Sequence, residues 1–282
     1  MDNTLPMSSL RTQTTPDTPR VFFLGNAPSF FDRVQRFFNQ HEIETYTLSA
    51  LELSSLDTKT LDTQSIYKVI WWVDFFDAQE TLEILRFLMQ FSNLSLMVIG
   101  EIPENFSFSQ EKNAKYSEAR EVFTQVLESL PQSQFFFLRD FLGEKNISSF
   151  FQFTLQNTEK NILLDPEKEV FFTDLESLFQ SVEPAFFKPH SSQKIVIQGK
   201  AGGSTKHLDF LSQLHQTYYQ SPLEVIPVVA ERESPAELSS FFPVVASCDV
   251  KKHLDQRVQE KDQWKNYQQT LPFSLQKQVE RA

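Results

Sequence analysis

A turn near residue 25 has the residue types that bind a phosphate. A short apolar run from residue 20 ends at Gly25, and a helical pattern begins at Ser29. A strand, a glycine-containing turn and a helix, in this order, bind phosphate through backbone N–H groups at the start of the helix. We therefore take Gly25, Asn26 and Ser29 as candidate cofactor-binding residues.

Two positions of this turn depart from the glycine-rich pattern. Pro28 stands where a second glycine would let the backbone approach a pyrophosphate, and its ring removes one N–H donor. Phe31 stands where a third glycine would let the helix pack closely on the strand. The sequence therefore predicts a turn whose architecture is retained and whose phosphate chemistry is altered.

Other residue types that carry chemistry are few. The single cysteine, Cys248, excludes a disulfide within the chain and a zinc site built on cysteines. His207 and His215 lie on one predicted helix, but their spacing is too long for two metal ligands, so we expect no metal site. Asp74 and Asp77 flank a phenylalanine pair at a strand end, and we interpret them as a turn and a helix cap.

The composition indicates an acidic protein with a full hydrophobic core. Of its 282 residues, 40% are hydrophobic and 22% are charged, which suits one large domain. The formal net charge of -11 argues against binding to nucleic acid or to an anionic membrane. No apolar run approaches the length of a membrane span, and the amino terminus lacks the pattern of a secretory signal. We therefore expect a cytoplasmic protein.

Apolar runs and amphipathic patterns alternate through the first half of the chain. This alternation predicts an α/β fold, a doubly wound parallel sheet covered by helices on both faces. Ligands bind such sheets at the carboxyl ends of the strands, which lie near Gly25, Asp74, Gly100 and Arg139. Arg139 therefore joins the candidate cofactor-binding residues. The predicted strands are residues 21–24, 43–48, 68–73, 94–99 and 134–138, and the predicted helices are residues 29–40, 78–91 and 114–130.

Beyond residue 140 the predicted elements are shorter and less regular. They suggest a main domain at residues 20–160 and a smaller region at 161–248 that is interleaved with it. Residues 1–19 are predicted to be a disordered tail and residues 249–282 a polar helical tail. The predicted strands of the smaller region are residues 161–164, 169–172, 194–198 and 223–228, and its predicted helices are residues 175–182 and 205–219.

The chain has 29 phenylalanines and only 6 glycines, and many of the phenylalanines are consecutive. Strands that are buried on both faces contain consecutive apolar residues, so we interpret most of these pairs as core. The alternative is that some of them form an apolar docking face for a partner or a ligand. The pairs at residues 150–151 and 241–242 lie outside the predicted strands and are less well explained by the core.

The order of these segments resembles that of the extended short-chain dehydrogenase/reductases, the nucleotide-sugar epimerase and dehydratase group. Residues 20–25 resemble the first strand and turn of that family. Residues 115–120 open a helix where the family has Tyr-x-x-x-Lys, and residues 135–139 are similar to the strand that follows. Residues 169–175 match a later short strand and helix. The resemblance implies a Rossmann-like sheet with a small carboxyl-terminal α/β region on the substrate side.

The resemblance also implies catalytic residues and a cofactor. In the family a tyrosine acts as acid or base, and a lysine four residues later lowers its pKa and holds the ribose. Tyr116 matches the tyrosine, but Arg120 replaces the lysine and does not readily release a proton. The family has a serine or threonine after its fourth strand, and residues 98–103 contain no match for it. The family also has an acidic residue after its second strand, and residues 46–49 contain no match for that one. Tyr116 and Arg120 are the candidate catalytic residues, with NAD or NADP as the implied cofactor.

The altered turn, hydroxyl and lysine together favour a protein that no longer transfers hydride. We expect a scaffold or accessory subunit of a larger assembly, with a protein partner and no cofactor. The resemblance also implies that two copies pair through the helix that begins near Tyr116. The alternatives are an NAD(P)-dependent epimerase, dehydratase or reductase with an atypical active site, or a module that senses a nucleotide.

Overall fold

The structure is a computed structural model, and it describes the central sheet with the helices that cover it. Among the residues that the structure describes, which are given at the end of this paragraph, no helix is both long enough and apolar enough to cross a membrane. Predictions about the two tails, Cys248, His207, His215 and the pair at residues 150–151 lie outside the described residues. The described residues are 19–48, 52–53, 66–91, 94–103, 110–142, 162–164, 169–170, 172–188, 192–199, 205–206, 209, 212, 216, 225–227, 238 and 240–246.

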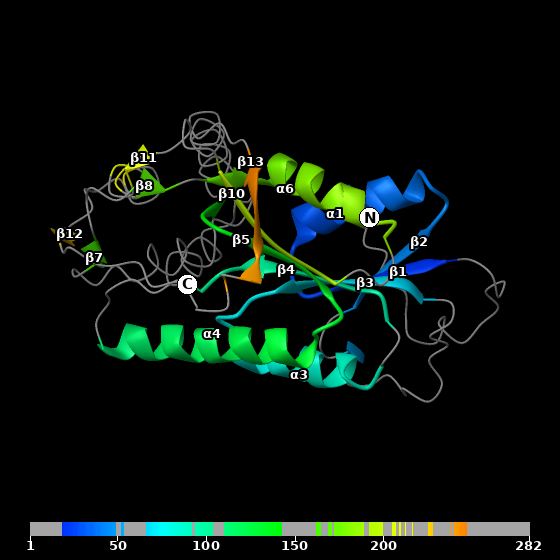
Figure 1. The fold of residues 1–282 in the computed structure, drawn as a ribbon, viewed down its shortest axis with the longest axis horizontal. Helices are drawn as coiled ribbons and strands as arrows, with labels where there is room; N and C mark the ends of the chain where they lie inside the picture. Colours follow the sequence, from blue (N-terminus) through cyan, green and yellow to red (C-terminus); the bar gives the residue numbers. More distant parts are fainter. Residues whose placement is uncertain are drawn as a thin grey trace, which may run out of the picture.

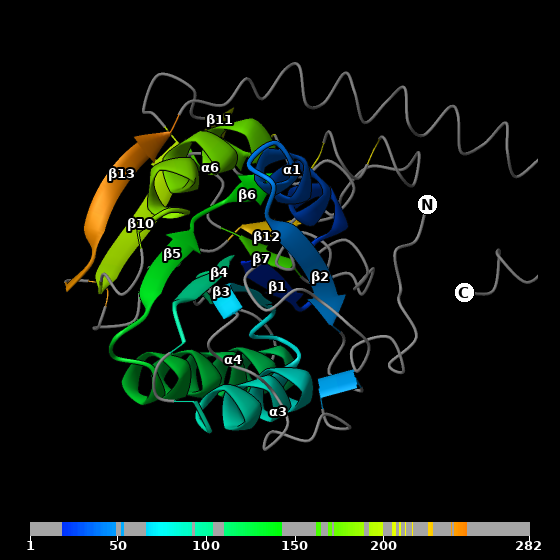
Figure 2. The same ribbon diagram turned by 90° about the vertical axis from the view of Figure 1, so that its right-hand side faces the viewer.

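Seven parallel strands form the central sheet, in the order β13-β10-β5-β4-β3-β1-β2 (Figures 1 and 2). The sheet starts with β1, β2 pairs on one side of it, and every later strand of this sheet lies on the other side of β1. This is a doubly wound, Rossmann-like sheet, so the predicted fold class is confirmed. The strands are β1 (Arg20–Leu24), β2 (Glu44–Leu48), β3 (Ile66–Val73), β4 (Leu96–Glu101), β5 (Gln134–Leu138), β10 (Gln193–Gly199) and β13 (Phe242–Ala246).

Helices cover both faces of the sheet, so the molecule has three layers (Figure 1). The helices α1 (Pro28–Asn39) and α6 (Leu175–Val182) lie on one face, and α3 (Ala78–Leu88) and α4 (Gln110–Ser129) lie on the other. A short 3-10 turn, η3 (Glu183–Ala185), continues α6.

Asp77 is the N-cap of α3 and Asp174 is the N-cap of α6. An aspartate is suited to this position because its side-chain oxygen can accept a hydrogen bond from a free N–H of the first turn. Asp77 Oδ1 accepts a hydrogen bond from the backbone N–H of Glu80 at 3.0 Å, which confirms the predicted cap of α3. Asp74 Oδ1 accepts from the N–H of Phe76 at 3.0 Å in the turn before that helix.

The side chains of consecutive residues in a strand point to opposite faces of the sheet, so consecutive apolar residues pack against both helix layers. In β5, Phe135 and Phe137 pack against the α3 and α4 layer, whereas Phe136 packs against the α1 and α6 layer. All three are at most 1% exposed. In β1, Phe22 and Phe23 divide in the same way. The interpretation of these phenylalanines as core is confirmed.

Shorter ladders complete the described fold and correct two predictions. The predicted helix at residues 205–219 is wrong at its start, because Thr205 and Lys206 form β11 and pair with β8. Of the pair at residues 241–242, Phe241 precedes the strand as predicted, but Phe242 opens β13, whose Pro243 is tolerated at the edge of the sheet. The ladders are β6 (Phe141–Leu142) with β9 (Thr173–Asp174), β7 (Ile162–Leu164) with β12 (Val225–Pro227), and β8 (Glu169–Val170) with β11 (Thr205–Lys206).

Candidate functional site

The carboxyl ends of β1, β3, β4 and β5 lie along one edge of the sheet, which we call the carboxyl edge. Because these neighbouring strands are all parallel, the residues that follow them share this edge. Gly25 follows β1, Asp74 follows β3, and Arg139 follows β5. The prediction that these strand ends meet at one edge is confirmed.

The topological switch point of the sheet lies between β1 and β3. The connection after β1 runs through α1 on one face, and the connection after β3 runs through α3 on the other (Figure 1). The two connections diverge from neighbouring strands, and ligands of open α/β sheets bind in the crevice that this divergence leaves. The switch point therefore identifies where a ligand of this fold binds.

Gly25 is required by the backbone geometry of this switch point. Its φ angle is +87°, a value that side chains disfavour. A Cβ atom at this position would also collide with the carbonyl oxygen of Trp72 on β3. The turn at Gly25 thus lies directly against the backbone of the neighbouring strand.

The first turn of α1 has backbone donors that no side chain caps. Ala27 is the N-cap residue and makes no side-chain cap hydrogen bond, and Pro28 occupies the first helical turn without an N–H. The first N–H to bond within the helix is that of Phe31, which donates to the carbonyl of Ala27 at 2.8 Å. The N–H groups of Ser29 and Phe30 precede it, and they are the donors that the helix start offers to an anion.

Phe31 fills the position of the third glycine with an aromatic ring. This ring stacks on Phe23 of β1, with centroids 4.9 Å apart and planes 11° apart. Phe31 is 5% exposed, so the ring belongs to the core between α1 and the sheet. The close helix–strand contact that a glycine allows is therefore replaced by stacked rings.

Arg139 lies at the far end of the carboxyl edge, three strand spacings or about 14 Å from β1. It is half-buried, and its Nη1 donates a hydrogen bond to Gln198 Oε1 at 3.4 Å. Burial lowers the pKa of the Arg139 guanidinium, and the neighbouring Asp140 carboxylate partly offsets this. Because the ordinary pKa is so high, the guanidinium stays charged at neutral pH.

A buried hydroxyl belongs to Thr173, whose backbone contacts Asp140, the residue after this arginine. The backbone N–H of Thr173 donates to the carbonyl of Asp140 at 3.1 Å. Thr173 is fully buried, and among the described residues its Oγ1 has no hydrogen-bond partner. Sequence reasoning missed Thr173, because only the β6–β9 pairing brings it beside the end of β5.

Trp72 lies at the switch point, and sequence reasoning missed it as a site residue. Its indole is half-buried between the rings of Phe30 and Phe141, with centroid distances of 5.5 Å to each. The available signal was the Trp-Trp pair at the end of β3, because a strand places one of two neighbours on each face.

The candidate catalytic residues lie in α4, on the α3 and α4 face. Arg120 is half-buried, and its backbone carbonyl accepts a hydrogen bond from Thr124 Oγ1 at 3.0 Å. The side chain of Tyr116 lies outside what the structure describes, so the roles of Tyr116 and Arg120 stay predictions. No group of three or more metal-ligating side chains occurs in the described part of the chain.

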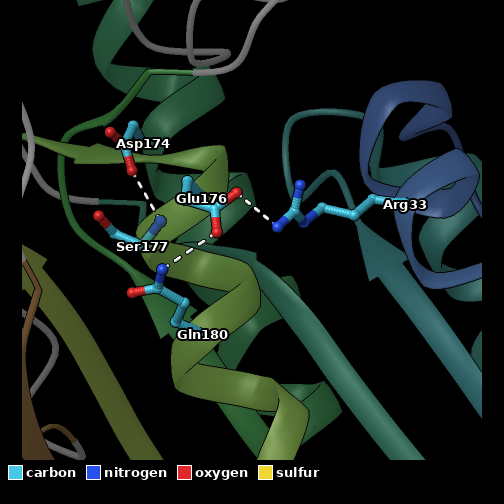
Figure 3. Close-up of polar contacts among 5 residues, drawn as sticks. All are labelled: Arg33, Asp174, Glu176, Ser177 and Gln180. Carbon is cyan, nitrogen blue, oxygen red and sulfur yellow. Dashed lines mark hydrogen bonds and ion pairs between the residues drawn. The ribbon is translucent and has the colours of Figure 1, made fainter. Parts of the chain in front are cut away.

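An ion pair joins α1 to α6 (Figure 3). Arg33 Nη2 lies 2.5 Å from Glu176 Oε2, and the guanidinium carbon lies 4.5 Å from the centre of the Phe179 ring. Gln180 donates to the other carboxylate oxygen of Glu176 at 3.0 Å, and Asp174 caps α6 by accepting from the N–H of Ser177 at 2.7 Å. Arg33 is therefore the residue of α1 that contacts α6 in this view, and the other two hydrogen bonds lie within α6 and its cap.

Comparison with known proteins gives structural similarity without sequence similarity. No family model matches the chain, and no curated protein matches it. A dTDP-4-dehydrorhamnose reductase ortholog from Clostridium acetobutylicum gives a TM-score of 0.49 at 11% identity, covering 85% of this chain and 98% of that chain. A dTDP-glucose 4,6-dehydratase from Bacillus anthracis, in complex with NAD, gives 0.46 at 11% identity, with coverage of 89% and 97%.

A UDP-N-acetylglucosamine 4-epimerase from Bacillus cereus gives a TM-score of 0.45 at 10% identity, covering 86% of this chain and 96% of that chain. These names come from the group that the sequence resembles. At such identities and TM-scores the fold class of this chain rests on its own strand order, and the class that fold and site define is a Rossmann-like α/β protein.

Proposed function

We propose that this protein binds NAD or NADP along its carboxyl edge. The observation that carries the proposal is the switch point between β1 and β3, where Gly25 at a φ of +87° leads into an uncapped helix. A glycine turn followed by a helix start with free N–H groups is the arrangement that binds a pyrophosphate.

The residues of the carboxyl edge offer contacts to a dinucleotide at two separate positions. The N–H groups of Ser29 and Phe30 would hold a phosphate at the turn, with Asn26 exposed beside it. Arg139 would contact a polar group at the other end of the ligand. Because about 14 Å separates β1 from β5, one phosphate does not reach both positions, which favours an extended ligand over a mononucleotide.

Bound nicotinamide would supply hydride transfer, the chemistry that a protein side chain lacks. In this proposal Tyr116 holds or releases the proton that accompanies the transfer. Arg120 supplies positive charge near Tyr116, one helical turn away, in place of the usual lysine. The reaction class is therefore that of an NAD(P)-dependent epimerase, dehydratase or reductase with an atypical active site.

A second candidate function is the non-catalytic scaffold or accessory subunit. The observation that favours it is the pair of departures in the turn, Pro28 at the helix start and Phe31 stacked on Phe23. Tyr116→Phe separates the two candidates once turnover is measured. Loss of turnover with an unchanged Kd for NAD supports the enzyme, whereas the scaffold predicts no change in any function of the protein.

Calorimetric titration of the purified protein with NAD and with NADP tests the proposal. We expect a micromolar Kd for one of them and a Kd at least about tenfold higher in Arg139→Gln, because a hydrogen bond to a charged group is lost. Arg36→Gln is the matched control, because Arg36 is exposed near the far end of α1 and, among the described residues, its side chain donates to the carbonyl of Asp32 alone. Absence of binding at millimolar NAD and NADP would refute the proposal and favour the scaffold.

A further inference from the structure

Two neighbouring tryptophans at the end of β3 have different surroundings. Trp71 is 1% exposed and belongs to the core on the α3 and α4 face. Trp72 is half-buried and packs on the α1 and α6 face. The core explains Trp71, but it does not explain why a large amphipathic ring stays only partly buried at position 72.

Trp72, near the end of β3, lies directly beside Gly25 of the glycine turn. A Cβ atom built on Gly25 would lie 3.6 Å from Trp72 Cβ, and it would collide with the Trp72 carbonyl oxygen. The two residues are therefore in contact across the switch point between β1 and β3. The indole thus begins at the place where the proposed function puts the pyrophosphate.

Two buried rings fix the indole in this position. Phe30, in the first turn of α1, is 2% exposed and meets the indole at an interplanar angle of 45°. Phe141, which follows β5, is 6% exposed and meets it at 55°. Aromatic contacts of this tilted kind hold a ring in a defined orientation. The indole is therefore preorganised before any ligand binds.

The indole N–H is a donor that the protein leaves open. Indole nitrogen only donates hydrogen bonds, and a buried tryptophan usually finds an acceptor. Within the described ranges Trp72 Nε1 makes no hydrogen bond, and it is not among the buried nitrogens that lack a partner. The N–H is therefore open to an acceptor from outside the protein core, on a ring that contacts Phe30 of the first turn of α1.

From these contacts, and resting on the proposed function, we infer that Trp72 is a ligand-binding residue. Its indole N–H donates a hydrogen bond to a pyrophosphate oxygen of the bound dinucleotide. This bond replaces the backbone donor that Pro28 removes from the turn, so the altered turn and the Trp72 donor are two parts of one binding site.

Calorimetry on matched variants tests this inference. Trp72→Phe keeps a ring between Phe30 and Phe141 and removes only the donor, whereas Trp71→Phe changes the buried neighbour and is the control. Each protein is titrated with NAD, NADP, ADP-ribose and adenosine. We expect Trp72→Phe to raise the Kd for the three pyrophosphate compounds at least about tenfold, with little change for adenosine. Trp71→Phe should bind all four like the unaltered protein.

A second measurement does not depend on the folding of the Trp72 variant. The chain has 3 tryptophans, so Trp71→Phe with Trp264→Phe leaves Trp72 as the single indole. We expect saturating ADP-ribose to change the emission of that indole, and adenosine to leave it unchanged.

The possible outcomes separate the inference from the proposed function. If the unaltered protein binds NAD or NADP, and Trp72→Phe binds equally tightly or the single-indole emission stays constant at saturation, the inference is wrong and the function stands. If the unaltered protein binds neither dinucleotide, the proposed function fails and the inference fails with it.

Discussion

The ammonium of Lys68 donates a hydrogen bond of 2.6 Å to the carbonyl oxygen of Ala185, which joins the start of β3 to the end of η3. The same Nζ donates to Gln134 Oε1 at 3.0 Å and to the carbonyl of Lys188 at 3.2 Å. Lys68 is 0% exposed, and all three acceptors are uncharged. Three acceptors match the three donors of an ammonium, so the buried charge is hydrogen-bonded but not neutralised.

The stability of the protein should therefore depend on pH through Lys68. Burial lowers the pKa of Lys68 from its ordinary 10.5 to about 8. Between these two values the folded state has lost the proton that the unfolded state still holds, so the contribution of Lys68 to stability rises with pH. Below pH 8 both states are protonated, and the contribution is constant.

Urea unfolding of the unaltered protein and of Lys68→Met at pH 7, 8, 9 and 10 measures this dependence. Above pH 8 we expect the unfolding free energy of the unaltered protein to rise relative to that of Lys68→Met, by up to roughly 1.4 kcal/mol per pH unit. Lys188→Met is the control, because the Lys188 side chain is exposed. A difference that stays constant from pH 7 to 10 would contradict the prediction.

The stack of Phe31 on Phe23 should make the altered turn important for stability. Phe31→Ala removes a ring that is 5% exposed and leaves a cavity between α1 and β1. We expect the free energy of unfolding to fall by about 3–5 kcal/mol. Phe187→Ala, at a position 42% exposed, should cost much less. Equal effects of the two substitutions in urea unfolding would show that the stack is not part of the core.

Gly25 should tolerate no side chain. Gly25→Ala places a methyl group against the Trp72 carbonyl oxygen and forces alanine to a φ of +87°. We expect a loss of at least about 2 kcal/mol in thermal or urea unfolding. Gly100→Ala should cost less, because its Cβ would lie 2.9 Å from the Val73 carbonyl oxygen without a positive φ. The reverse order of the two effects would refute the role given to Gly25.

The ion pair between Arg33 and Glu176 should contribute little to stability in spite of its short distance. The two side chains are 35% and 51% exposed, so solvent screens the pair. In a double-mutant cycle of Arg33→Met and Glu176→Gln we expect a coupling energy below about 1 kcal/mol that falls further in 1 M salt. A coupling energy of several kcal/mol would mean that the pair is a main link between α1 and α6.

The sequence was sufficient wherever the deciding interaction is local. The strand at residues 134–138 and the helix at 175–182 have the predicted bounds, because the spacing of their apolar residues indicates the type of element directly. The cap by Asp77 was predicted for the same reason, since its partner Glu80 is three residues away. The turn at Gly25 followed from its position between a strand and a helix.

Only the tertiary structure decided features that depend on distant partners. β11 is a strand because it pairs with β8, and β13 is a strand because β10 offers it an edge, although Pro243 argues against a strand in the sequence alone. The acceptors of Lys68 lie 66, 117 and 120 residues away along the chain.

The neighbours of Trp72 also come from separate elements, α1 and β6, and no local pattern brings them together. The sequence by itself thus determined the elements and their order, because hydrophobic period and capping are properties of neighbouring residues. Packing of the sheet decided which side chains meet at the carboxyl edge, because those contacts exist only once distant strands have paired.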